Sequence, residues 1–145
     1  MTEPTSTTSE VQARILIVDD HPNTSATLAR ILEGTHTSVE ILTALNGQEA
    51  LALVGEGVDV LIVDYLMPDM TGLELIEQLR ALPIRQPART ILITAHHSTE
   101  LVELSRQVQV DDYLVKPVHP KQIRGLVEGV LHKLYPASSS SRSCF

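Results

Sequence analysis

Five polar residues stand directly after short aliphatic runs of the chain, where they could combine into one chemical site. They are Asp19, Asp20, Asp64, Thr94 and Lys116. If the aliphatic runs are parallel strands, these side chains lie at the carboxyl edge of the sheet, where open α/β sheets bind their ligands. The three carboxylates would then repel each other, and the repulsion would raise the pKa of at least one of them.

A divalent cation would relieve this repulsion, and a site made of oxygen ligands suits Mg²⁺. The formal charges also balance, because the charge of three aspartates equals that of Mg²⁺ together with Lys116. Such a site could accept a phosphoryl group. A carboxylate would supply the nucleophile, and the cation and the ammonium would stabilise the equatorial oxygens. Thr94 could donate its hydroxyl to one of those oxygens.

Each of these residues has an ordinary structural explanation when it is taken alone. The Asp19-Asp20 pair could cap a helix, and Asp64 could serve the turn that follows it. Thr94 and Lys116 could simply be strand-end and loop residues. The joint placement favours a site, because turn propensity alone does not readily put such residues after four separate aliphatic strands.

The elements that must position these residues alternate along the chain. Aliphatic runs without polar alternation are typical of strands buried on both faces, and the segments between them carry apolar residues at helical spacing. Pro22 suits a first helical position, and Asn46 and Ser98 suit N-caps. The pattern predicts a parallel sheet covered by helices on both faces. We predict strands over 14–18, 38–43, 58–63, 89–94 and 111–115, and helices over 22–33, 46–54, 71–81, 98–108 and 119–134.

Composition indicates one globular domain with an aliphatic core. The chain has 145 residues, of which 43% are hydrophobic and only 3% aromatic. We expect residues 1–12 to be disordered, 13–134 to form the domain, and 135–145 to be a flexible tail or linker. The net charge of −7 does not suggest direct nucleic-acid binding, and no apolar run is long enough to cross a membrane. With Cys144 as the single cysteine, these features lead us to expect a cytoplasmic protein.

Four segments of the chain closely resemble the receiver domain of bacterial two-component response regulators. The spacing between the acidic residues, Thr94 and Lys116 is also similar to that of the family. The resemblance extends over residues 13–134 and implies a flavodoxin-like (βα)5 fold with strand order 2-1-3-4-5. The segments that carry it are Ile15–Asp20, Asp64–Gly72, Thr94-Ala95 and Tyr113–Pro117.

The resemblance implies that Asp64 takes its phosphoryl group from a phosphohistidine of a sensor histidine kinase or a phosphotransfer protein. Lys116 would pair with that group, and Thr94 would hydrogen-bond it. The Lys116–Pro117 bond is expected to be cis, which X–Pro bonds tolerate. The domain would phosphorylate and dephosphorylate only itself, and it would not be an enzyme with an external substrate.

The same resemblance implies how the cofactor Mg²⁺ would be held. Asp20 and Asp64 would ligate it directly, together with the backbone carbonyl of Leu66. Asp19 would act through a metal-bound water. Leu66 and His96 would also tune the lifetime of the phosphoryl group, because they flank the path of the attacking water.

A switch is implied as well. Thr94 would move toward the phosphoryl group and Tyr113 would turn into the vacated space, which changes the face formed by helix 98–108, strand 111–115 and helix 119–134. Tyr113 could instead be a buried aromatic residue whose hydroxyl reaches water.

The same face is a possible homodimer surface. Its charged residues could form ion pairs there, although charges of this kind are commonly just solvated. They are Asp111, Asp112, Arg106, Lys121 and Arg124.

Some positions depart from the family pattern, and other functions are conceivable. Gln109-Val110 stand where receivers often have Gly-Ala, and Val118 stands where a larger apolar residue is common. One alternative is a receiver-like docking module that is not phosphorylated, although the complete residue set argues against it. Another is a phosphatase of the haloacid dehalogenase type, whose Asp-x-Asp motif is not supplied by Asp64–Leu66. A flavodoxin-like cofactor binder would need a phosphate-binding loop after the first strand, and none is present.

Overall fold

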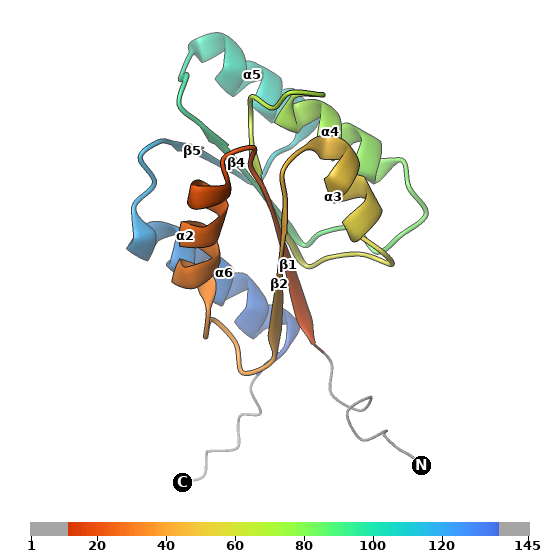
Figure 1. The fold of residues 1–145 in the computed structure, drawn as a ribbon, viewed down its shortest axis with the longest axis vertical. Coiled ribbons are helices and arrows are strands. Elements are labelled where there is room, and N and C mark those ends of the chain that lie inside the picture. The colour runs from red at the N-terminus through yellow and green to blue at the C-terminus, as the bar shows by residue number, and fades with distance from the viewer. Residues whose placement is uncertain (1–11, 137–145) are drawn as a thin grey trace, which may run out of the picture.

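A computed structural model describes residues 12–136 of the chain, and it places a five-stranded sheet between two layers of helices (Figure 1). The predicted disordered start and flexible tail fall outside the described residues, apart from Gln12, Tyr135 and Pro136. The elements are β1 (Ala13–Val18), α2 (Pro22–Leu32), β2 (Val39–Ala44), α3 (Gly47–Leu53), β3 (Val60–Asp64), α4 (Gly72–Arg80), β4 (Arg89–Thr94), α5 (Thr99–Val108), β5 (Asp112–Val115) and α6 (Pro120–Leu134).

The sheet is parallel throughout and its strands lie in the order β2-β1-β3-β4-β5. This confirms the predicted flavodoxin-like fold class. The predicted elements all form, and most ends differ by one or two residues. Strand β3 begins at Val60, two residues later than predicted, and it includes Asp64 as its last residue.

The helices begin where the sequence supplies caps. At the start of α3, the side chain of Asn46 accepts a hydrogen bond from the Glu49 backbone N–H. At the start of α5, the side chain of Ser98 accepts one from the Leu101 backbone N–H. Helix α4 begins with a capping box of Thr71 and Glu74, in which each side chain accepts from the other residue's backbone N–H. Polar side chains therefore satisfy N–H groups that helix geometry leaves free at these three starts.

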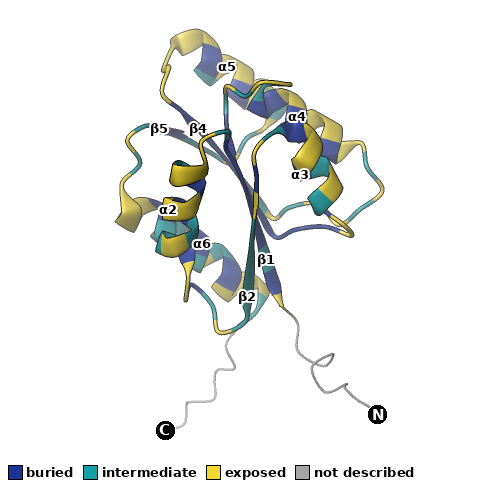
Figure 2. Ribbon diagram, viewed as in Figure 1, coloured by how far each residue is buried: buried dark blue, intermediate teal, exposed yellow. Residues whose placement is uncertain are grey.

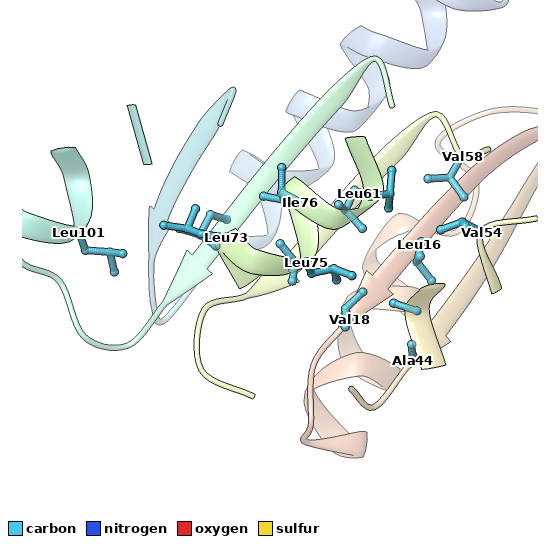
Figure 3. Packing of buried hydrophobic residues seen from close by; sticks show 14 residues of the cluster. Leu16, Val18, Ala44, Val54, Val58, Leu61, Leu73, Leu75, Ile76 and Leu101 are labelled. Atoms are coloured by element: carbon cyan, nitrogen blue, oxygen red, sulfur yellow. The ribbon is translucent and has the colours of Figure 1, made fainter. Parts of the chain in front are cut away.

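Each strand contributes to two cores, because alternate side chains point to opposite faces of the sheet. Leu16, Val18 and Leu61 pack on the side covered by α3, α4 and α5 (Figure 3). Ile15 and Ile17 pack on the side covered by α2 and α6. Figure 2 shows the central strands buried while the outer faces of the helices are exposed. Both cores are aliphatic, as the composition predicted.

The packed part of the domain extends one residue beyond the predicted boundary at residue 134. Tyr135, which the sequence placed in the flexible tail, is half-buried, and its hydroxyl donates to Asp59 Oδ1 at 2.9 Å. Within residues 12–136, the structure contains no helix with the length and apolar character needed to cross a lipid bilayer.

Candidate functional site

The carboxyl edge of the sheet gathers the polar residues that the sequence singled out. Asp19 and Asp20 follow β1, Asp64 ends β3, Thr94 ends β4 and Lys116 follows β5. Strand β1 pairs with β3, β3 with β4, and β4 with β5. The register therefore brings residues that are far apart in sequence to one end of the molecule.

Lys116 supplies a positively charged side chain at the carboxyl edge of the sheet. Its Nζ lies 3.3 Å from Asp64 Oδ1 and donates to Asp19 Oδ2 at 3.4 Å. Burial alone would lower the pKa of Lys116, but the carboxylates of Asp64 and Asp19 outweigh burial and raise it. The lysine therefore stays charged between two acidic groups. Its peptide bond to Pro117 is cis, as the resemblance implied.

Asp64 is a buried acid whose surroundings disfavour its charged form. It is only 7% exposed, and burial raises its pKa above the ordinary value of 3.8. Asp19 raises the pKa further, whereas Lys116 lowers it. The repulsion anticipated from the sequence is thus present, and one ammonium group offsets it only in part.

The backbone beside Asp64 is held by a close approach of Gly72. The Gly72 N–H donates to the Tyr65 carbonyl at 2.7 Å. A Cβ atom on Gly72 would lie 2.7 Å from the Asp64 carbonyl oxygen and 2.9 Å from Leu92 Cδ1, closer than real Cβ contacts. Only glycine fits here without moving the strand that carries Asp64.

Asp69 anchors the loop between Asp64 and Gly72 to a neighbouring helix. Its carboxylate accepts hydrogen bonds from the backbone N–H groups of Gly47 at 3.0 Å and Gln48 at 2.9 Å, at the start of α3. The bond from Gly47 is the largest influence that lowers the pKa of Asp69. The loop that follows Asp64 is therefore held to α3 by Asp69, and the hydrogen bond from Gly72 to Tyr65 closes it.

Among residues 12–136, four residues at this edge offer atoms that could hold a metal ion. Asp19, Asp20, His21 and Asp64 each provide one ligand atom, and these atoms all lie within 4.8 Å of one another. Asp20 Oδ1 is buried, yet no described residue gives it a hydrogen bond. A cluster of acceptor oxygens with one oxygen left unsatisfied fits a divalent cation. The Leu66 side chain is exposed, and a role for its backbone carbonyl as a ligand stays a prediction.

Thr94 and His96 lie together beside this cluster. Thr94 is 1% exposed, and its Oγ1 accepts a hydrogen bond from the His96 backbone N–H at 2.9 Å. The Lys116 backbone N–H donates to the Thr94 carbonyl at 2.8 Å. These contacts link the ends of β4 and β5. The imidazole of His96 is exposed, and its predicted place beside the path of the attacking water stays a prediction.

Tyr113 is half-buried in β5 and points toward the loop after β4. Its hydroxyl oxygen lies 3.1 Å from His97 Nδ1, and the two rings meet edge to face at 5.6 Å between their centres. His97 is not among the residues that the sequence singled out. The three residues between Thr94 and Ser98 gave no pattern from which this contact could have been predicted.

Three of the charged residues expected on the α5–β5–α6 face have partners outside the predicted set. Asp112 forms a two-point ion pair with Arg89 at 2.6 and 3.0 Å. Arg106 pairs with Glu103 on its own helix at 3.0 Å. Arg124 Nη1 donates to the carbonyls of Ile31 and Glu33, at 2.6 and 2.8 Å. Within residues 12–136, none of the five predicted charged residues pairs with another of the five, and an ion-paired homodimer surface on this face stays a prediction.

Sequence reasoning also missed a buried acid at the opposite edge of the sheet. Asp59 is 1% exposed and accepts from the Arg14 backbone N–H at 2.8 Å and from the Tyr135 hydroxyl at 2.9 Å. Its Oδ1 also pairs with the Arg85 guanidinium. The available signal for this buried acid was its position between Val58 and Val60, directly before β3, in an otherwise aliphatic run. Because it lies at the amino edge, Asp59 takes no part in the acidic cluster.

Comparisons with known proteins agree with this geometry. The family model of the response regulator receiver domain matches residues 15–128. A chemotaxis protein CheY homolog of Campylobacter jejuni is 35% identical over 123 residues, which cover 81% of this chain and 92% of that protein. The alkaline phosphatase synthesis transcriptional regulatory protein PhoP of Bacillus subtilis is 30% identical, with 88% of this chain and 52% of that protein covered. The crystal structure of a CheY-like receiver domain protein from Methanospirillum hungatei superposes with a TM-score of 0.71 at 30% identity, covering 85% of this chain and 96% of that one.

Proposed function

We propose that this chain, which belongs to the response regulator receiver domain family, is a signalling switch that accepts a phosphoryl group on Asp64. The observation that carries the proposal is the position of Lys116, whose ammonium contacts both Asp64 and Asp19 at the carboxyl edge. A carboxylate nucleophile next to a fixed cation is the arrangement that phosphoryl transfer needs.

The transfer begins with a phosphohistidine of a sensor kinase or a phosphotransfer protein. A carboxylate oxygen of Asp64 attacks phosphorus, the N–P bond breaks, and the imidazole leaving group takes up a proton. Lys116 pairs with a phosphoryl oxygen and offsets the charge that collects there. Thr94, which is buried at the end of the neighbouring strand, hydrogen-bonds another of these oxygens. No external substrate is turned over.

Asp19, Asp20, Asp64 and the Leu66 carbonyl would hold Mg²⁺ in this site. The unsatisfied oxygen of Asp20 and the crowding of the acids support this assignment. When bound, the ion would neutralise the carboxylates and stabilise the charge on the phosphoryl oxygens. Asp19 also contacts Lys116, which fits the smaller role of acting through a metal-bound water.

The donor protein would approach over a hollow beside Lys116. The hollow has a volume of about 510 Å³ and is largely apolar, with Leu28, Ile31 and Val118 among its walls. An apolar hollow that opens next to the charged site suits a protein surface that presents its phosphohistidine to Asp64.

Phosphorylation would change the α5–β5–α6 face through Thr94 and Tyr113. In the structure, the Tyr113 hydroxyl contacts His97, and the Thr94 hydroxyl accepts from the His96 backbone N–H. A phosphoryl group that draws Thr94 toward it would favour a different position of the tyrosine, which is a two-state equilibrium biased by new contacts. Leu66 and His96 would set the lifetime of the phosphorylated state. Unaltered dephosphorylation after Leu66→Asn would contradict the role of Leu66.

Intact-mass measurement after incubation with acetyl phosphate and Mg²⁺ tests the proposal. We expect the wild-type chain to gain one phosphoryl group and Asp64→Asn to gain none. Asp69→Asn is the matched control, because Asp69 is a nearby carboxylate that points to α3 instead of the site. An adduct that persists in Asp64→Asn would overturn the assignment. Steady release of phosphate from varied phosphate esters would indicate a phosphatase.

A further inference from the structure

We propose that His21 is a ligand of the cation in the acidic cluster, and that its imidazole shifts the preference of the site from Mg²⁺ toward Mn²⁺ and other first-row transition ions. The inference rests on the proposed function, because it concerns the same cation site. It adds a nitrogen donor to a set of ligands that the sequence treated as oxygen only.

The first argument is the spacing of three atoms. His21 Nδ1 lies 3.1 Å from Asp19 Oδ1 and 3.1 Å from Asp20 Oδ1. Ligand atoms that are each about 2.1 Å from an octahedral ion are about 3.0 Å from their neighbours. The nitrogen and the Asp20 oxygen therefore have the separation of neighbouring ligands around one ion.

The second argument is that hydrogen bonding satisfies only one of the two carboxylate oxygens, because His21 Nδ1 is hydrogen-bonded to Asp19 Oδ1 at 3.1 Å. A ring nitrogen carries at most one hydrogen, so Nδ1 cannot serve both carboxylates. Asp19 Oδ1 already accepts from the His21 backbone N–H at 2.9 Å. The buried Asp20 Oδ1 has no hydrogen bond from any residue between 12 and 136. A cation would contact the nitrogen and the Asp20 oxygen at once, and Asp19 would act through a water bound to that cation.

The third argument is that the fold makes no other use of the ring. His21 is the N-cap of α2, but its side chain makes no capping hydrogen bond. The side chain is 67% exposed, so it is not part of the core. Pro22 follows it at the start of the helix and restricts the preceding backbone to an extended conformation, which His21 adopts. The ring is thus held at the mouth of the site without a structural partner outside it.

Imidazole is a ligand that discriminates among metals. Mg²⁺ prefers oxygen donors, whereas imidazole nitrogen suits first-row transition ions. Removing the ring should therefore weaken Mn²⁺ binding while it leaves Mg²⁺ binding nearly unchanged. A purely structural role for His21 would affect both ions equally.

Pulsed electron paramagnetic resonance with Mn²⁺ tests this assignment on the untagged full chain. We expect a ¹⁴N coupling to bound Mn²⁺ in the wild type and in His96→Ala, which removes a neighbouring surface imidazole. The coupling should be lost in His21→Ala and in His21→Asn. Calorimetric titrations should show Mn²⁺ affinity reduced about tenfold or more in His21→Ala, with Mg²⁺ affinity changed by less than about twofold. His21→Asn keeps an oxygen donor at this position if the alanine variant folds poorly.

The possible failures are distinguishable. Bound Mn²⁺ without a ¹⁴N coupling in the wild type would overturn the role of His21 and leave the phosphorylation switch standing. Tighter binding of both ions by His21→Ala would also overturn it and would mean that the ring obstructs the site. Wild-type protein that binds neither ion, and gains no adduct from acetyl phosphate, would overturn the proposed function as well.

Discussion

Asp59 and Asp64 lie at opposite ends of strand β3, and the two buried carboxylates have opposite surroundings. Asp59 is enclosed by donors, namely the Arg14 backbone N–H, the Tyr135 hydroxyl and the Arg85 guanidinium. Asp64 faces other acids, and burial and Asp19 raise its pKa. One acid therefore stabilises the fold, and the other destabilises it while the site holds no cation.

Asp64→Asn should stabilise the cation-free protein at neutral pH by about 1 to 2 kcal/mol. The folded state binds the Asp64 proton more tightly than the unfolded state does, so stability falls as the pH rises from 3.8 through the raised pKa. The gain from Asp64→Asn should accordingly shrink in acid, where the wild-type group is protonated. Urea unfolding with a chelator at several pH values measures this. An equal effect at all pH values would contradict the electrostatic cause.

Asp59→Ala should destabilise the protein by about 3 kcal/mol. The substitution leaves the buried Arg14 N–H and the Tyr135 hydroxyl without their acceptor, and it separates Arg85 from its partner. Tyr135→Phe removes a single hydrogen bond and should cost about 1 kcal/mol. Both are measured by urea unfolding, and phosphorylation of the folded fraction by acetyl phosphate should continue in each. If folded Asp59→Ala were no longer phosphorylated, the prediction that Asp59 acts only on stability would be wrong.

Gly72→Ala should destabilise the fold by about 1 to 3 kcal/mol and slow phosphorylation. The added Cβ atom would press against the Asp64 carbonyl oxygen, so relief of the clash must move the acceptor strand or helix α4. Gly125→Ala in α6 is the matched control, because no atom lies within 4 Å of its added Cβ. That change should stabilise the helix by about 0.5 to 1 kcal/mol and leave the phosphorylation rate unchanged. Equal phosphorylation rates in the two variants would contradict the role of Gly72.

Gln109→Gly should stabilise the fold by about 0.5 to 1 kcal/mol. Gln109 ends α5 with φ 65° and ψ 48°, a left-handed conformation that disfavours residues with a Cβ atom. Its carbonyl still accepts from Arg80 Nη2 after the substitution, because only the side chain changes. Gln109→Ala retains the Cβ atom and should bring no gain. Thermal unfolding of the two variants side by side measures the difference.

The fold could be predicted from sequence because its signals are local. Aliphatic runs such as Ile15–Val18 mark buried strands wherever they stand, and polar residues that end them must lie at one edge of a parallel sheet. Asn46 and Ser98 cap helices through contacts within a single turn. Strand ends and helix starts therefore follow from residues close together in the chain.

Features that depend on distant partners could not be predicted in the same way. Asp59 is satisfied by Arg14, Arg85 and Tyr135, which come from three separate parts of the chain. The left-handed conformation of Gln109 has no signal in the residue type itself, and the available hint was that receivers often have glycine at this position. The sequence did not single out His21, because the direction of its ring depends on how α2 begins.

The hydrogen bond between Tyr135 and Asp59 also determines which end of the molecule faces solution when the chain is immobilised through either end of the domain. Tyr135 reaches Asp59 at the amino edge of the sheet, where β1 also starts, so Gln12 and Pro136 both lie far from Asp64. A fluorophore or a sensor-chip linkage placed near either residue would leave the acidic pocket open to solution. Binding of a phosphodonor protein can therefore be followed on an immobilised chain without blocking the surface that it must reach.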